Sequence, residues 1–260
     1  MKKILAWIYA GAIFVLIYLP IAVMAAMSFN RSRYNALPFE FSLHWYRELS
    51  ANRELFAGTR YSILLAAAAA VICMVLGTLL VYGISRSSRR LKNRIQTLSI
   101  LPLTIPWIIL GISLLLFIRF LGFNRNFFFL LMGHVVVTIP YFILVLNARI
   151  ESLDLSLEDA SYTLGANALK TFWRVSLPTL LPAILAGAFL AFLVSFNMFV
   201  LSYFLIETGS STLPIEIYTS IKFGFTPEIN GISTLILAVS TLLFIAVAVL
   251  TRHTLKQLME

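Results

Sequence analysis

The polar residues with the most informative spacing lie in residues 157–178, a charged segment between two long apolar runs. Ser156 followed by Asp159 has the form of a capping box, which begins a short helix. Gly165 suits the end of that helix, and the Asn167 side chain can cap the start of a second one. The chemistry expected of this pattern is hydrogen bonding and docking through two short helices joined at a glycine.

The same segment also has a predicted end. Leu177-Pro178 follows it, and a proline disfavours helical backbone in the residue before it. We therefore expect the second short helix to stop there.

Residues for enzymatic chemistry are scattered or absent. The chain has no Gly-x-x-x-x-Gly-Lys-Ser/Thr phosphate loop and no Gly-x-Ser-x-Gly elbow. His44, His134 and His253 lie far apart, which argues against a zinc site, and the single cysteine, Cys73, lies in an apolar run. We predict no catalytic residue, no metal site and no cofactor in this chain.

The composition is that of an integral membrane protein. The chain is 60% hydrophobic and 12% charged, whereas soluble proteins are about 25% charged. The net charge of +9 is interpreted as a topology signal, so no nucleic-acid partner is expected.

Six apolar segments are long enough to cross a bilayer, at about 20 residues per crossing. They are residues 4–27, 61–84, 98–118, 127–147, 180–205 and 230–251. The predicted fold class is therefore all-α, with six transmembrane helices in one transmembrane domain covering residues 1–260. The first segment is too long for the apolar region of a signal peptide, so we expect it to be retained.

The longest connection is the predicted outer loop, about residues 28–59, and it is too short for a core of its own. Its aromatic residues suit a segment lying against the membrane interface. They are Phe39, Phe41, Trp45 and Tyr46. Residues 39–43 alternate in polarity, but we expect an irregular lid rather than a strand.

The distribution of basic residues predicts the orientation. With both termini in the cytoplasm, twelve lysines and arginines lie inside and eight outside. The inner set is Lys2, Lys3, Arg86, Arg89, Arg90, Lys92, Arg94, Arg149, Lys170, Arg174, Arg252 and Lys256. The predicted cytoplasmic loop, about residues 149–178, is then accessible to a soluble partner.

Small residues recur every four positions in the fifth apolar segment, at Ala183, Gly187, Ala191 and Ser195. This spacing allows close helix packing, and a pore-lining face is the alternative. His134 is expected to be a neutral histidine hydrogen-bonded inside the bundle rather than a substrate contact.

The third apolar segment and Asn197 are candidates for lying beside a translocation path. Pro102 and Pro106 make the third segment the least regular helix, and we place it beside that path. For Asn197, an interhelical hydrogen bond and a substrate contact remain equally open.

The segment 157–178 resembles the signature loop of type I ABC-importer permease subunits, which reads Glu-Ala-Ala, three residues, Gly, nine residues, Ile, one residue, Leu-Pro. Here Asp159-Ala160-Ser161, Gly165 and Val175 to Pro178 keep that spacing. The resemblance implies a loop that couples the permease to an ATPase. The coupling residues it implies are Glu158, Asp159, Ala160, Ser161, Gly165, Phe172, Leu177 and Pro178.

The resemblance covers nearly the whole chain. Residues 28–32 with Trp45-Tyr46, residues 213–218 and residues 226–230 are similar to the second permease of spermidine/putrescine-type transporters. This implies an inner-membrane importer with a second homologous permease, two ATPase subunits that bind ATP and Mg, an extracytoplasmic substrate-binding protein and surrounding lipid. The chain itself is then not an enzyme.

Departures from that class concern the substrate. Polyamine permeases usually have Pro-Asp at the position of Pro106-Trp107 and Asp-Asp at the position of Asn197-Met198. A polycation needs anionic or dense dipolar partners in the membrane. The missing carboxylates favour another organic solute, with Trp107 facing a ring, an apolar group or a quaternary amine. Alternatively, the companion permease supplies the charge.

The predicted substrate path is Trp107, Asn197, Pro106 and Tyr203. The predicted cargo is a small organic solute, polyamine-type or related. The alternatives to an importer subunit are a carrier or channel and a membrane enzyme. A stand-alone secondary carrier or channel leaves the loop spacing unexplained, and a membrane enzyme needs clustered catalytic groups.

Overall fold

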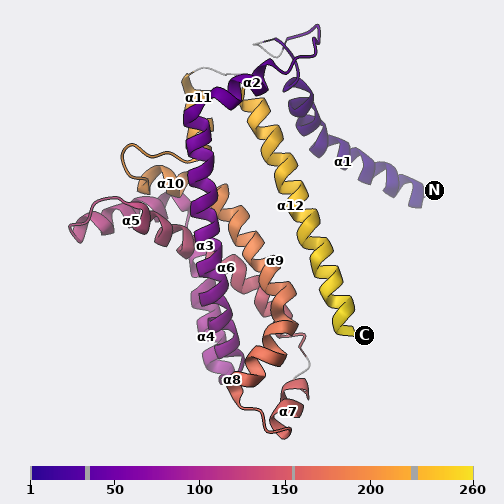
Figure 1. The fold of residues 1–260 in the computed structure, drawn as a ribbon, viewed down its shortest axis with the longest axis vertical. Helices are drawn as coiled ribbons and strands as arrows, with labels where there is room; N and C mark the ends of the chain where they lie inside the picture. The colour runs from indigo at the N-terminus through magenta and orange to yellow at the C-terminus, as the bar shows by residue number, and fades with distance from the viewer. Residues whose placement is uncertain (1, 33–35, 154–155, 224–227, 260) are drawn as a thin grey trace. The chain divides into compact units, whose positions relative to one another are not determined.

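The computed structural model describes residues 2–32, 36–153, 156–223 and 228–259, and over these ranges the chain is nearly all helical, with one isolated β-bridge between Asn30 and Phe41. Figure 1 shows the order of the elements. They are α1 (Lys2–Met27), α2 (His44–Ala51), α3 (Arg53–Ser85), α4 (Arg89–Ile100), the 3₁₀-helix η1 (Leu101–Thr104), α5 (Trp107–Phe120), α6 (Phe127–Ile150), α7 (Ser156–Thr163), α8 (Ala168–Thr171), the π-helix η2 (Phe172–Ser176), α9 (Leu177–Phe196), α10 (Phe199–Leu205), α11 (Leu213–Phe223) and α12 (Glu228–Met259).

Five helices within the described ranges are long and apolar enough to cross a membrane, and a bent pair makes a sixth. The all-α prediction is confirmed, but two predicted segments are not continuous helices. The third is bent by 99° between Arg89–Thr104 and Trp107–Phe120, because Pro106 has no backbone N–H and Ile105 is extended before it. The fifth ends at Phe196, and α10 follows after Asn197 and Met198.

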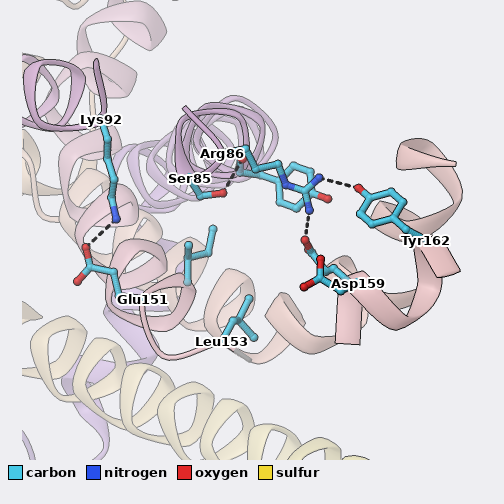
Figure 2. A pocket seen from close by; sticks show the side chains of 10 residues that line it. Ser85, Arg86, Lys92, Glu151, Leu153, Asp159 and Tyr162 are labelled. Atoms are coloured by element: carbon cyan, nitrogen blue, oxygen red, sulfur yellow. Dashed lines mark hydrogen bonds and ion pairs between the residues drawn. The ribbon is translucent and has the colours of Figure 1, made fainter. Parts of the chain in front are cut away.

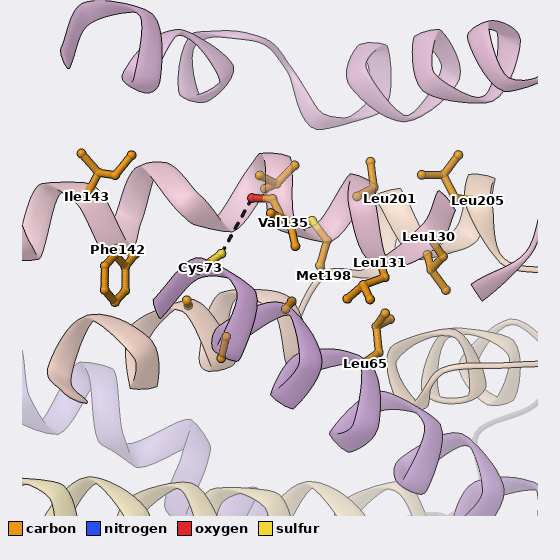
Figure 3. Close-up of a cluster of buried hydrophobic side chains, with 14 of the residues drawn as sticks. Leu65, Cys73, Leu130, Leu131, Val135, Phe142, Ile143, Met198, Leu201 and Leu205 are labelled. Carbon is orange, nitrogen blue, oxygen red and sulfur yellow. Dashed lines mark hydrogen bonds between the residues drawn. The ribbon is translucent and has the colours of Figure 1, made fainter. Parts of the chain in front are cut away.

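The chain divides into two compact units, Met1–Phe56 with Glu216–Ile245 and Ala57–Ile215 with Ala246–Glu260. In the second unit, the core lies where α3, α6, α9 and α10 meet (Figure 3). Figure 3 shows Leu65 and Cys73 of α3 close to Leu131 and Val135 of α6. These residues come from different apolar runs, so the core joins segments far apart in sequence.

Phe142 of α6 is fully buried between two glycines. A Cβ atom added at Gly77 of α3 would lie 2.4 Å from Phe142 Cδ1, and one at Gly187 of α9 would lie 2.9 Å from Phe142 Cδ2. Only a glycine leaves room for the ring on either side. The small residues of the fifth segment therefore serve helix packing at Gly187, as predicted.

His134 is buried, and both ring nitrogens have partners. Its Nδ1 lies 2.8 Å from Ser195 Oγ and its Nε2 lies 3.0 Å from Ser202 Oγ. The prediction of a hydrogen-bonded histidine inside the bundle is confirmed.

The first unit contains the predicted outer loop. Trp45 is buried, and its indole N–H donates to the Asn30 carbonyl at 2.8 Å. Ser28 Oγ and Tyr46 Oη are 2.7 Å apart. The burial of Trp45 was not predicted, because its hydrogen bond joins residues 15 positions apart. That this segment lies against the membrane interface stays a prediction. Phe39 and Phe41 are exposed.

Residues 28–32 and Trp45-Tyr46, which resemble the outer loop of polyamine permeases, thus hydrogen-bond to each other. The backbone of residues 39–43 is irregular, as expected, apart from the single bridge at Phe41. In the motif at residues 226–230, Thr226 and Pro227 lie outside the described residues.

Candidate functional site

The signature segment folds as two short helices joined at Gly165, as predicted. Gly165 has φ +82°, a left-handed conformation that favours glycine. The Gly165 N–H donates to the Tyr162 carbonyl and the Ala166 N–H donates to the Ser161 carbonyl, which is the Schellman pattern. Asn167 Oδ1 accepts from the Lys170 N–H at 2.9 Å and so caps α8.

The predicted stop at Leu177-Pro178 was wrong. Helical backbone continues from α8 through η2 into α9, and Pro178 lies in the first turn of α9. Pro178 is accommodated directly after the wider π-helical turn η2. The π-helix η2 carries the chain into the span without a break.

Glu158 of α7 joins the loop to the ends of two longer helices. Its carboxylate pairs with the Arg86 guanidinium, just beyond α3, and accepts a hydrogen bond from Ser176 Oγ in η2. Arg86 Nη1 also donates to Tyr162 Oη at 3.0 Å. The Arg86 guanidinium lies 4.3 Å from the centre of the Tyr82 ring, within the range of a cation–π contact.

These contacts keep Arg86 charged. Burial lowers the pKa of the Arg86 guanidinium. The Tyr162 hydrogen bond and the Glu158 charge raise that pKa by more than burial lowers it, so it lies above its usual value. A guanidinium is always protonated in proteins. The cation in the link between α7 and the end of α3 is therefore always present.

The loop is also held internally. Ser161 Oγ and Thr171 Oγ1 are 3.0 Å apart and join α7 to α8. The Phe172 ring packs 4.7 Å from the Tyr82 ring, centre to centre. Of the predicted coupling residues, Glu158, Ser161 and Phe172 thus hold the loop, whereas Asp159 and Ala160 are exposed.

An open cleft of about 540 Å³ lies beside this loop (Figure 2). Figure 2 shows the Lys92–Glu151 pair, 3.1 Å apart, and the Arg86–Tyr162 pair on different sides of it. Asp159 also lines the cleft. Further along the loop, large apolar side chains are exposed. They are Leu157, Leu164, Leu169 and Trp173.

Four residues of this site were not predicted from the sequence, namely Tyr82, Arg86, Tyr162 and Ser176. Arg86 was counted only as a topology signal. Its position at the end of a span, in a chain with few charges, could have marked it as a partner for an acidic loop residue.

A second cleft, of about 280 Å³, brings together two of the predicted path residues, Trp107 and Asn197. Tyr141, which was not predicted, lines the same cleft. Trp107 begins α5 and Asn197 follows α9, so both stand at the breaks in the apolar segments. Asn197 Nδ2 donates to the Leu193 carbonyl of α9 at 2.9 Å, so this bond is not interhelical.

The other two predicted path residues lie outside the lining of that cleft. Pro106 is the N-cap of α5, and its carbonyl accepts from the Ile109 and Leu110 N–H groups. Tyr203 is half exposed on α10, with its ring near Phe199 and Phe204.

Comparison with known families gives a match over residues 74–259, which cover most of the chain, to the family described as binding-protein-dependent transport system inner membrane component. The chain belongs to this family. The permease is 34% identical to the putrescine transport system permease protein PotI of Escherichia coli K12, over 90% of this chain and 86% of that protein. It is 29% identical to the spermidine/putrescine transport system permease protein PotC of the same strain, over 95% of this chain and 94% of that one.

Solved structures confirm the fold. A bacterial ABC transporter that imports the acidic polysaccharide alginate contains a chain that matches the permease with a TM-score of 0.72 at 17% identity, covering 95% of each chain. The methionine transporter MetNI matches with a TM-score of 0.63 at 18% identity, over 77% of this chain and 96% of that one. The fold is that of a type I importer permease, and the protein is a permease subunit of an ABC importer in the inner membrane.

Proposed function

We propose that the permease forms part of the translocation path for an organic amine of the polyamine type or a related kind, delivered by an extracytoplasmic binding protein. The observation that carries this proposal is the cleft shared by Trp107, Tyr141 and Asn197. Two aromatic rings and an amide can hold an ammonium group through π faces and a carbonyl dipole. The names of the PotI and PotC relatives support the same class of solute.

The cleft differs from a carboxylate site. Among the described residues of the chain, those that line this cleft include no aspartate or glutamate. An ammonium group would therefore be stabilised here by dipoles and π faces, with any carboxylate supplied by a companion permease. This balance suits weak, transient binding along a path.

Energy for transport comes, in this proposal, from two partner ATPase subunits that bind ATP and Mg. The loop from α7 to η2 docks on one of them. The support is its combination of a firm base, through Glu158, Ser161 and Phe172, and exposed apolar side chains at Leu164 and Trp173. Asp159 and Ala160, exposed on α7, face the partner, and Leu177 and Pro178 carry its movement into α9.

A second, homologous permease completes the path, and lipid surrounds the pair. The support within the first unit is α1, whose apolar window from Ala6 to Met27 has no buried residue. A helix so apolar and so uncovered needs lipid or another permease around it.

The test is uptake and ATPase stimulation by the complete reconstituted transporter, with its binding protein. The solute panel contains putrescine, spermidine, a quaternary amine, amino acids and phosphonates. We expect an amine to stimulate ATP hydrolysis. Stimulation only by amino acids or phosphonates would contradict the proposed cargo, and uptake without any ATPase would favour a secondary carrier.

A substitution of Trp107 tests whether the cleft contacts the transported solute. In Trp107→Ala, we expect the KM for the transported amine to change at least about five-fold, with normal assembly of the complex. Ile108→Ala, an exposed neighbour on α5 that does not line the cleft, is the matched control. Equal kinetics in the two variants would remove Trp107 from the path.

A further inference from the structure

The break between α9 and α10 is bridged by one buried side chain from another helix. His134 of α6 contacts Ser195 Oγ, before the break, at 2.8 Å and Ser202 Oγ, after it, at 3.0 Å. All three residues are buried, with 1–3% of their surface exposed. The imidazole ring therefore spans the interruption that holds Asn197 and Met198.

Hydrogen counting fixes the direction of each bond in a neutral ring. Ser202 Oγ donates its one hydrogen to the Met198 carbonyl at 2.7 Å. It must then accept from His134, so Nε2 carries the ring hydrogen. Nδ1 is left as an acceptor, and the Ser195 hydroxyl donates to it. The chain of bonds runs from Ser195 through His134 and Ser202 to Met198.

The backbone at the break is a tight turn. Met198 has φ −78° and ψ 87°, and the Phe199 N–H donates to the Asn197 carbonyl at 3.0 Å across it, which is an inverse γ-turn. Within a membrane, non-helical backbone persists only where protein or a cavity satisfies its polar groups. The Phe199 N–H satisfies the Asn197 carbonyl here, and the Ser202 hydroxyl adds a bond to the Met198 carbonyl, the N-cap carbonyl of α10.

We propose that His134 is a positioning residue that holds this turn and thereby sets where Asn197 and Met198 lie in the cleft opposite Trp107 and Tyr141. Both turn residues line that cleft. His134 itself is not in the lining, so it acts through the turn. The effect on transport rests on the proposed function, whereas the effect on the turn does not.

The turn can be tested without any substrate, by cysteine labelling. Cys73 is the one cysteine of the chain, so a Cys73→Ser, Met198→Cys background has one reporter thiol at a position that is 2% exposed. The probe is N-ethylmaleimide on the purified full-length complex. Adding His134→Ala should raise the labelling rate about ten-fold, because the bridge is lost and two hydroxyls lose a partner.

Thr138→Val is the matched control. Thr138 is as deeply buried on α6, and its hydroxyl bonds the His134 carbonyl and Cys73 rather than either side of the break. We expect this variant to label at the background rate. If His134→Ala labels no faster than Thr138→Val, the proposal is overturned.

Two more variants keep the test decisive. Ser202→Ala removes one end of the bridge and should also raise the labelling rate, even if His134→Ala does not assemble. His134→Gln, which keeps one donor and one acceptor on its amide, should bring the rate back towards the background. A His134→Gln variant as fast as His134→Ala would mean that the ring serves only as packing, against the proposal.

Putrescine uptake adds the functional readout. His134→Ala should raise KM several-fold with a smaller change in kcat, because it displaces residues of the cleft that Trp107 lines. If no solute of the panel is carried, or if Trp107→Ala has normal kinetics, the proposed function fails while labelling still decides the role of His134. Faster labelling with unchanged KM would overturn the link from the turn to the cleft.

Discussion

Gly165 is the residue whose conformation the loop depends on most directly. A Cβ atom at Gly165 would meet nothing within 4 Å, yet its φ of +82° strains any residue with a side chain. We expect Gly165→Val to cost about 1–3 kcal/mol in the loop and to lower uptake at least about ten-fold, with normal membrane insertion. Uptake and ATPase rates measured on the same vesicles check this.

The matched control at this position is Gly165→Asn, because asparagine tolerates the left-handed conformation. It should retain most of the uptake. Equal loss in both variants would mean that the side chain, and not the backbone, matters here.

Arg86 offers a second prediction at the residue scale. Arg86→Gln leaves Glu158 without its cation, and the pair is partly exposed, at 34% and 13% of the two side chains. After discounting for solvent, we expect a loss of about 1 kcal/mol and a several-fold drop in coupled transport. The measurement is the ratio of solute carried to ATP hydrolysed.

Lys92→Gln is the comparison variant, since it breaks the Lys92–Glu151 pair in the same cleft without touching Glu158. Its coupling ratio should stay near that of the wild type. The double variant Arg86→Glu, Glu158→Arg should recover part of the lost coupling, and no recovery would contradict a role for the ion pair.

What could be predicted at this scale was local. Gly165 and Asn167 were identified because turn and cap geometry depends on residues within one helical turn. Arg86 was not identified as the partner of Glu158, because it lies 72 positions earlier and a single sequence does not show which distant residues pair. The bond from Trp45 to the Asn30 carbonyl was missed for the same reason, since it is also tertiary.

At the scale of elements, the packing of α6 against α3 and α9 is set by glycines. Gly187→Ala places a Cβ atom 2.9 Å from the Phe142 ring, and such overpacking costs about 1–3 kcal/mol. We expect a lower midpoint of thermal unfolding in detergent.

Gly83→Ala in α3 is the matched change, because a Cβ atom there meets nothing within 4 Å. It should leave the midpoint unchanged or raise it, since alanine favours a helix over glycine by about 1 kcal/mol. Adding Phe142→Leu to Gly187→Ala should restore part of the lost stability, and an additive loss would contradict direct contact.

Hydropathy does not show where the two helix breaks lie. The sequence stays mostly apolar around Ile105-Pro106 and around Asn197-Met198, so hydropathy averaged over a window indicates two uninterrupted spans. Pro106 gave a local warning of irregularity, but nothing in the sequence around Met198 encodes a γ-turn. In the structure, Ser202 bonds the Met198 carbonyl of that turn, and His134 of another helix bonds Ser202.

At the scale of the whole molecule, the distribution of basic residues predicts that both termini and the loop of residues 156–178 lie on the cytoplasmic side. Alkaline phosphatase fused at the C-terminus should be inactive, and green fluorescent protein fused there should fluoresce. Phosphatase inserted after Asn124 should be active. Activity of the C-terminal phosphatase fusion would reverse this orientation.

The π-helix η2 sets the angle, measured around the α9 axis, at which the side chains of the loop lie relative to α9. Each residue turns an α-helix by about 100°, and η2 accommodates one residue more than an α-helical turn would. Deleting one residue within Phe172–Ser176 would rotate the face that carries Leu164 and Asp159 by roughly that angle about the α9 axis. Chimaeras that exchange loops between permeases must therefore keep the number of residues in η2, because that number sets the direction in which Leu164 and Asp159 lie around α9.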